Sequence, residues 1–145
     1  MRKVSGSCHC GNVRVDLELA REPVTYHPRA CDCDFCRKHG AAYVSDPQGS
    51  LSIRLQEAGS MSSYRQGSGA AECIFCRSCG VLIGALYRSD GRIWGAINAK
   101  IVESPTSFGT EEVVSPKALS RDDKGKRWQD IWFSNVTIEC AGAGA

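Results

Sequence analysis

The stretch Cys76-Arg77-Ser78-Cys79-Gly80 is a Cys-x-x-Cys-Gly sequence, which is the pattern of a zinc-knuckle turn. The two-residue spacer lets both sulfurs reach one ion, and Gly80 permits the left-handed backbone conformation that closes such a turn. Two thiolates do not complete a tetrahedral site, so a second pair is needed. Cys8-His9-Cys10, followed by Gly11, is the natural partner. We therefore predict a closed four-thiolate zinc site that joins the first strand to the middle of the chain and stabilises the fold.

A third cluster, Cys31-Asp32-Cys33-Asp34-Phe35-Cys36, supplies three thiols within six residues. A fourth ligand must come from elsewhere in the chain or from solvent. His39, which follows Cys36 by three residues, is one candidate, and Asp32, Asp34 and His27 are the others. The spacing leaves two interpretations open. A catalytic zinc keeps one position for water or substrate, whereas a structural zinc takes four protein ligands.

The nine cysteines do not fit a disulfide framework. Disulfide-rich chains are usually short and secreted, whereas 145 residues are enough for one domain with a substantial core. An odd number of cysteines also fits complete pairing poorly. The N-terminal residues contain no apolar stretch, and no later run is long enough to span a bilayer. We therefore expect no signal peptide, no membrane partner and a cytoplasmic location.

Three residues near the clusters are not expected to bind metal. Cys73 precedes the knuckle within a strand-like stretch, so we predict a small core or surface thiol. Cys140 lies near the C-terminus and is expected to be free. His9 lies between two ligands, and in an extended segment its side chain would point away from the ion.

The formal charge of +2 counts every thiol as neutral. Seven bound thiolates add seven negative charges and two zinc ions add four positive ones, so the balance becomes about −1. A basic run near the C-terminus comprises Lys117, Arg121, Lys124, Lys126 and Arg127, with Trp128 beside it. Asp122, Asp123 and Asp130 interrupt the run, so we predict a solvated loop and expect no nucleic-acid partner.

Most of the chain reads as short strands separated by turn residues. Apolar and polar residues alternate over Val13–Leu19 and again over residues 51–55, as in half-buried strands. Further strands are expected at residues 41–45, 61–66, 70–75, 81–87 and 92–98. Trp128, Ile131 and Trp132 have helical spacing, which predicts a short helix over residues 125–133. We expect one mainly β domain over residues 1–145, with no internal repeat.

The three clusters together resemble the glutathione-dependent formaldehyde-activating enzyme family, which includes centromere protein V. Gly6-Ser7-Cys8-His9-Cys10-Gly11-Asn12-Val13 is similar to the opening Gly-x-Cys-x-Cys-Gly strand of that family. The sequence from Cys31 to Ala41 is similar to its central Cys-x-Cys-x-x-Cys-Arg motif with a trailing Gly-Ala, and Phe75-Cys76-Arg77-Ser78-Cys79-Gly80 is similar to its knuckle. The resemblance covers roughly residues 5–105, and we find no motif in the C-terminal extension, residues 106–145.

The resemblance implies a β-tent fold, built from small antiparallel sheets with little helix and stabilised by a structural zinc. It implies that Cys8, Cys10, Cys76 and Cys79 bind this ion. It also implies that Cys31, Cys33 and Cys36 hold a second zinc with room for a substrate thiol, which makes them the catalytic site and favours the open interpretation.

The reaction that the resemblance implies joins formaldehyde to glutathione and gives S-hydroxymethylglutathione, a carbon–sulfur lyase reaction when written in reverse. An open zinc lowers the pKa of a bound thiol and so favours the nucleophilic thiolate. Candidate partners for the glutathione carboxylates are Arg29, Arg37, Lys38 and Arg65. The alternative is a non-catalytic, zinc-stabilised binding module for a protein partner.

Overall fold

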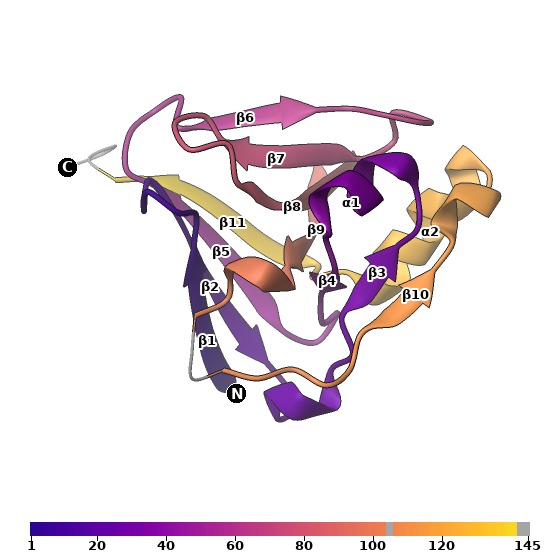
Figure 1. Cartoon of the computed structure of the whole chain (residues 1–145), viewed down its shortest axis with the longest axis horizontal. Coiled ribbons are helices and arrows are strands. Elements are labelled where there is room, and N and C mark those ends of the chain that lie inside the picture. Colours follow the sequence, from indigo (N-terminus) through magenta and orange to yellow (C-terminus); the bar gives the residue numbers. More distant parts are fainter. Residues whose placement is uncertain (104–105, 142–145) are drawn as a thin grey trace.

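The computed structural model describes residues 1–103 and 106–141 of the chain. Alternating apolar residues build its first sheet, because Val13, Val15, Leu17 and Leu19 all point to the buried face of one strand. This sheet has four strands (Figure 1), in the spatial order β1 (Arg2–Ser7), β2 (Val13–Leu19), β5 (Ser50–Leu55) and β11 (Asn135–Cys140). β11 runs parallel to β5, and the other neighbours are antiparallel.

The second sheet has seven strands, and two of the three cysteine clusters, Cys31–Cys36 and Cys76–Cys79, lie in or next to its strands. Their spatial order is β10 (Glu112–Val114), β3 (Arg29–Cys31), β4 (Tyr43–Val44), β9 (Arg92–Asn98), β8 (Leu82–Ser89), β7 (Glu72–Cys76) and β6 (Met61–Tyr64). The edge pair of β10 and β3 is parallel, and the other neighbours are antiparallel.

Side chains from both sheets form the main core. Val15 and Ile53 of the first sheet belong to the same buried cluster as Ile83 and Ile97 of the second, with Phe133 fully buried among them. A second cluster lies between the seven-stranded sheet and α2 (Arg121–Ile131). The two sheets therefore share one core, and α2 covers a separate apolar region beside the central cysteine cluster.

α2 packs closely against β8. Gly125 allows this approach, because a Cβ atom there would lie only 2.5 Å from the Tyr87 hydroxyl oxygen. The Trp128 and Trp132 rings stack with centroids 4.7 Å apart, and both are buried. The remaining helical segments are α1 (Asp34–His39) and three single turns, η1 (Pro23–Thr25), η2 (Ala99–Ile101) and η3 (Pro116–Ala118). In the described part of the chain, no helix has the length and apolar character needed to cross a bilayer.

The mainly β prediction is confirmed, and the strands Val13–Leu19 and Arg92–Asn98 have the expected bounds. Other boundaries differ. Only Tyr43–Val44 of the expected strand at residues 41–45 is paired, and α2 begins before the predicted helix because the Ser120 side chain caps it by accepting a hydrogen bond from the Asp123 backbone. The prediction of a solvated loop for the basic run is wrong in its central part, because residues 121–131 form α2 and Trp128 is buried.

One buried carboxylate fastens the end of β2 to the loop after β4. Asp46 accepts hydrogen bonds from the Ala20 and Gln48 backbone amides, both at 2.8 Å, and from the Tyr26 hydroxyl at 2.6 Å. Burial alone would raise the pKa of Asp46, but the Ala20 amide, the Tyr26 hydroxyl and the Gln48 amide hold this pKa below its usual value of 3.8.

We expect Asp46→Asn to lower the free energy of unfolding by about 2 kcal/mol, because three hydrogen bonds to a charged acceptor are weakened. A carboxyl group whose pKa is lower in the folded than in the unfolded state stabilises the fold. This contribution is fully present above the unfolded-state pKa, and it is lost as the pH falls through the folded-state pKa. The difference in the free energy of unfolding between wild type and Asp46→Asn should therefore become smaller below about pH 4. Urea denaturation at several pH values measures this difference, and Glu139→Gln, at an exposed position, is the control. Equal stability of wild type and Asp46→Asn at neutral pH would refute this role.

Candidate metal centres and their cavity

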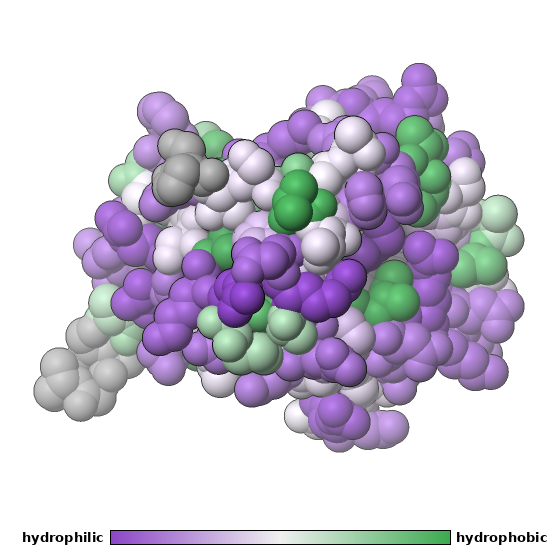
Figure 2. Space-filling model, turned by 90° about the horizontal axis from the view of Figure 1, so that it is seen from below, coloured by the Kyte–Doolittle hydropathy of each residue, from purple (hydrophilic) through white to green (hydrophobic). Residues whose placement is uncertain are grey.

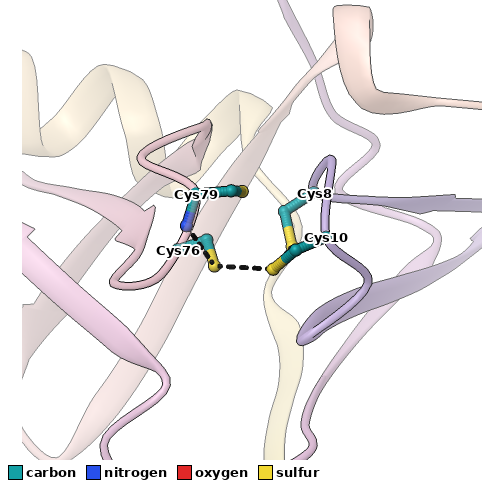
Figure 3. A group of neighbouring side chains, drawn as sticks. All are labelled: Cys8, Cys10, Cys76 and Cys79. Carbon is teal, nitrogen blue, oxygen red and sulfur yellow. Dashed lines mark hydrogen bonds between the residues drawn. The ribbon is translucent and has the colours of Figure 1, made fainter.

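The first centre brings together two cysteine pairs that lie far apart in the sequence. Cys8 and Cys10 lie in the loop after β1, and they face Cys76 and Cys79 at the end of β7 (Figure 3). All four sulfurs lie within 4.8 Å of one another. The Cys8 and Cys10 sulfurs are 3.7 Å apart, and the Cys10 and Cys76 sulfurs are 3.6 Å apart.

The two loops that carry these thiols are built alike. The Cys8 amide donates to the Val13 carbonyl at 2.9 Å, and the Cys76 amide donates to the Val81 carbonyl at 3.0 Å. Inside each loop a glycine follows the second cysteine with a positive φ, 84° at Gly11 and 79° at Gly80. Non-glycine residues seldom adopt this conformation, so the glycines that follow both pairs account for the shared turn.

The second centre comprises the thiols of Cys31, Cys33 and Cys36, whose sulfurs also lie within 4.8 Å of one another. Cys31 ends β3, and Cys33 is the N-cap of α1, where its sulfur accepts a hydrogen bond from the Cys36 amide at 3.4 Å. The sequence-based interpretation missed this helix. A cysteine that starts a helix lets the chain turn within three residues, and this turn brings Cys36 back toward Cys31.

Local hydrogen bonds favour a thiolate in this triad. A hydrogen bond from Cys36 is the largest influence on Cys31, and together with Cys33 it outweighs burial and lowers the Cys31 pKa to about 6. The Tyr43 hydroxyl lies 3.3 Å from the Cys36 sulfur, and burial raises the pKa of this tyrosine, so it stays protonated. The Gln66 amide nitrogen lies 3.8 Å from the Cys33 sulfur. The surroundings of the triad thus supply donors to sulfur.

None of the proposed fourth ligands joins the triad among the described residues. The His39 ring packs against Phe35 at 4.7 Å, and the His27 Nδ1 atom lies 2.9 Å from the Thr110 carbonyl oxygen. Asp32 accepts a hydrogen bond from Ser115, and Asp34 begins α1. Of the two interpretations that the spacing left open, the geometry therefore supports a triad without a fourth protein ligand.

A cavity of about 320 Å³ opens beside the triad, and all three of its thiols line this cavity. None of the four thiols of the first centre does so. Its apolar lining includes buried side chains of the second core cluster, namely Tyr43, Cys73, Ala85, Trp128 and Trp132. Its basic lining consists of Arg29, Lys117, Lys124 and Arg127, and none of the Asp and Glu residues in the described part of the chain lines it.

Cys73 lies in β7 and is buried, but it is not part of the triad. Burial, followed by the neighbouring Cys33 and Cys31, raises the pKa of Cys73 to about 11. It is therefore a neutral thiol in the cavity wall, in agreement with its expected role as a small core residue. Cys140 is a free, half-buried thiol in β11, and His9 is exposed.

Of the four predicted carboxylate partners, the structure places only Arg29 in the cavity lining. Arg37 and Lys38 are exposed in the last turn of α1, and Arg65 pairs with Glu72 at 3.7 Å. Lys117, Lys124 and Arg127 were noted in the sequence only as part of a basic run. The available signal was the three-residue spacing of Lys124 and Arg127, which is helical, but Asp122, Asp123 and Asp130 within the run concealed it; Lys117 lies before this helix, in η3.

The donor sets of both centres fit zinc. Tetrahedral zinc with Zn–S bonds of about 2.3 Å needs sulfurs about 3.8 Å apart, and the closest sulfurs of the first centre are 3.6 and 3.7 Å apart. All nine cysteines are free, so no thiol in either centre is consumed by a disulfide. Four thiolates would saturate a tetrahedral ion, whereas the three thiols that line the cavity would leave one of its positions without a protein ligand.

Comparison with known proteins gives the same assignment. The family model for the glutathione-dependent formaldehyde-activating enzyme matches residues 3–117. Among solved structures, the chain is similar to a Rhodobacter sphaeroides protein determined as a structural-genomics target. The two share 31% sequence identity with a TM-score of 0.53, over 69% of this chain and 88% of that one. The chain belongs to the glutathione-dependent formaldehyde-activating enzyme family.

Proposed function

We propose that the protein is a zinc-dependent carbon–sulfur lyase-like enzyme that joins a thiol, such as glutathione, to formaldehyde. One observation carries this proposal: the three-thiol centre lines a cavity with basic residues, whereas the four-thiol centre does not. A metal with an open coordination position beside a cavity could bind a substrate thiol, whereas a metal with four protein ligands could not.

In this proposal Cys31, Cys33 and Cys36, which line the cavity, would hold the catalytic zinc. Zinc bound there would supply Lewis acidity that favours the thiolate form of a substrate thiol at neutral pH. The Cys36 amide, the Tyr43 hydroxyl and the Gln66 amide group all lie beside the triad sulfurs. Hydrogen bonds from these groups would draw electron density from the triad sulfurs and so keep a metal bound there electrophilic.

The chemistry needs no oxidant or reductant. The substrate thiol loses its proton, its sulfur attacks the carbonyl carbon of formaldehyde, and the C=O π pair moves to oxygen. That oxygen then takes up one proton, so the product has the combined composition of thiol and aldehyde. The apolar wall around Trp128 and Trp132 limits water next to the reacting carbon and so favours the adduct over the aldehyde hydrate.

Cys8, Cys10, Cys76 and Cys79 have a structural role in this proposal. They would hold the structural zinc, which would fasten the loop after β1 to the end of β7 and so link the two sheets. Thiolate metal sites persist where thiols stay reduced, so we also propose a cytoplasmic location.

The alternative is a binding module for a protein partner. Such a module commonly presents a continuous apolar patch. On the face shown in Figure 2, the hydrophobic residues that the structure describes are separated by hydrophilic ones. The exposed large apolar side chains also lie on different elements, with Val24 in η1, Tyr64 in β6 and Val113 in β10. We therefore prefer the enzyme.

The test compares catalysed and spontaneous adduct formation. Zinc-loaded protein is mixed with ¹³C-labelled formaldehyde and glutathione, and the exchange rate between the aldehyde hydrate and S-hydroxymethylglutathione is measured by NMR. We expect a rate that rises in proportion to protein concentration. A rate equal to that in buffer, at every protein concentration, would refute catalysis and leave the binding module.

A further inference from the structure

We infer that Arg29 and Arg127 form a carboxylate clamp in the triad cavity, so that this enzyme selects thiols that carry a carboxylate. The inference rests on the proposed thiol chemistry for the position of the sulfur, and it adds the residues that set specificity. Arg127 belongs to α2, which begins at Arg121 and so lies beyond the residues 3–117 that match the family model.

Arg29 from β3 and Arg127 from α2 both line the triad cavity, and Arg29 also borders a second cavity that Ser45 lines. Arg29 lies in β3, and its Nη2 atom donates to the Ser45 hydroxyl at 2.6 Å. Ser45 in turn donates to the Ile131 carbonyl at 2.7 Å, at the end of α2. This chain of hydrogen bonds ties Arg29 to the helix that carries Arg127, while Arg29 still lines the cavity.

Neither arginine forms an ion pair with the described part of the protein, although the charge of Glu112, the register partner of Arg29 in β10, acts on Arg29. Within residues 1–103 and 106–141, no ion pair involves Arg29, Lys124 or Arg127, and none of the cavity-lining side chains is acidic. Lys117 differs, because it pairs with Asp32 at 3.8 Å. The positive charges that line the cavity repel one another. An anion that enters the cavity reduces this repulsion and is therefore bound favourably.

The charge of a zinc-bound triad is too small to balance all the basic residues of the cavity. Three thiolates with one zinc ion carry a net charge of −1, which a single cation offsets. Arg29, Lys124 and Arg127 supply three, so one positive charge remains for a ligand even when the Glu112 carboxylate is set against Arg29. Guanidinium groups bind carboxylates through two parallel hydrogen bonds, which fixes the ligand orientation as well as its charge.

α2 also offers a matched pair of positions for the test. Arg127 is half-buried and lines the cavity, whereas Lys126 beside it is exposed and does not. Arg127→Gln removes the charge and keeps a helix-compatible polar side chain. Lys126→Gln makes the same charge change on the same helix outside the cavity, so it controls for net charge and helix stability.

The experiment measures binding to the zinc-loaded protein by calorimetry, with tryptophan fluorescence as a second signal because Trp128 and Trp132 line the cavity. The probes are N-acetylcysteine and its neutral amide, which share the thiol and differ in the carboxylate. We expect wild type and Lys126→Gln to bind the acid about tenfold more tightly than the amide at low salt. In Arg127→Gln the preference should fall to about twofold or less, with affinity for the amide unchanged.

The outcomes separate this inference from the proposed function. If wild type binds acid and amide equally, the clamp is refuted while thiol binding stands. If neither thiol binds, the proposed function fails, and S-methylglutathione, which has carboxylates but no thiol, tests the clamp alone. Binding of S-methylglutathione that Arg127→Gln weakens and Lys126→Gln does not would support the clamp, and absence of such binding would overturn it.

Discussion

Cys76→Ser is expected to yield a protein that does not fold stably. Cys76 is 1% exposed, and its sulfur meets that of Cys10 across a separation of 66 residues. A structural zinc supplies about 10–16 kcal/mol in small zinc domains, and a domain of ordinary size has only about 5–15 kcal/mol of net stability. Loss of one of four thiolates therefore removes a large fraction of the stability of this chain.

Thermal unfolding followed by circular dichroism, together with the soluble yield, measures this effect. Cys140→Ser is the matched control, because it makes the same substitution at a free thiol outside both centres. We expect the control to unfold like wild type. A Cys76→Ser protein that is soluble, retains its full zinc content and melts with the control would contradict a structural role for the four-thiol centre.

Cys33→Ser is expected to have the opposite phenotype, with a folded protein that has lost one zinc ion and its activity. Serine is a good N-cap, so the start of α1 at position 33 is preserved when the sulfur is removed. The triad lies within one short segment and does not join distant parts of the chain, so its metal contributes less to the fold than that of the first centre.

Zinc content, melting temperature and the NMR exchange rate test this prediction together. We expect a melting temperature within a few degrees of wild type and an exchange rate at the spontaneous level. If Cys33→Ser is as unstable as Cys76→Ser, then the two centres do not have separate structural and catalytic roles.

The local part of the first centre could be predicted from the sequence. The Cys-x-x-Cys-Gly turn and the paired Cys8 and Cys10 determine their own backbone geometry, because both depend on short spacers and a following glycine. The alternation over Val13–Leu19 likewise identifies a half-buried strand without knowledge of its neighbours. These features depend on contacts within a few residues.

The cavity could not be predicted in this way, because its walls come from distant segments. Arg29, Gln66 and Arg127 meet only after β3, the loop after β6 and α2 have packed together. The parallel pairing of β11 with β5 also depends on a long connection, and the strand itself carried no motif. In α2, the alternation of acidic and basic residues concealed that Lys124 and Arg127, three residues apart, face the same side of a helix.

Native mass spectrometry of the purified protein tests the central claim most directly, since it counts metal ions on each intact chain. We expect two zinc ions per wild-type chain and one per Cys33→Ser chain, and a glutathione adduct on the former but not on the latter. A folded wild-type chain that carries no metal, or whose mass shows that cysteines have paired as disulfides, would contradict the claim.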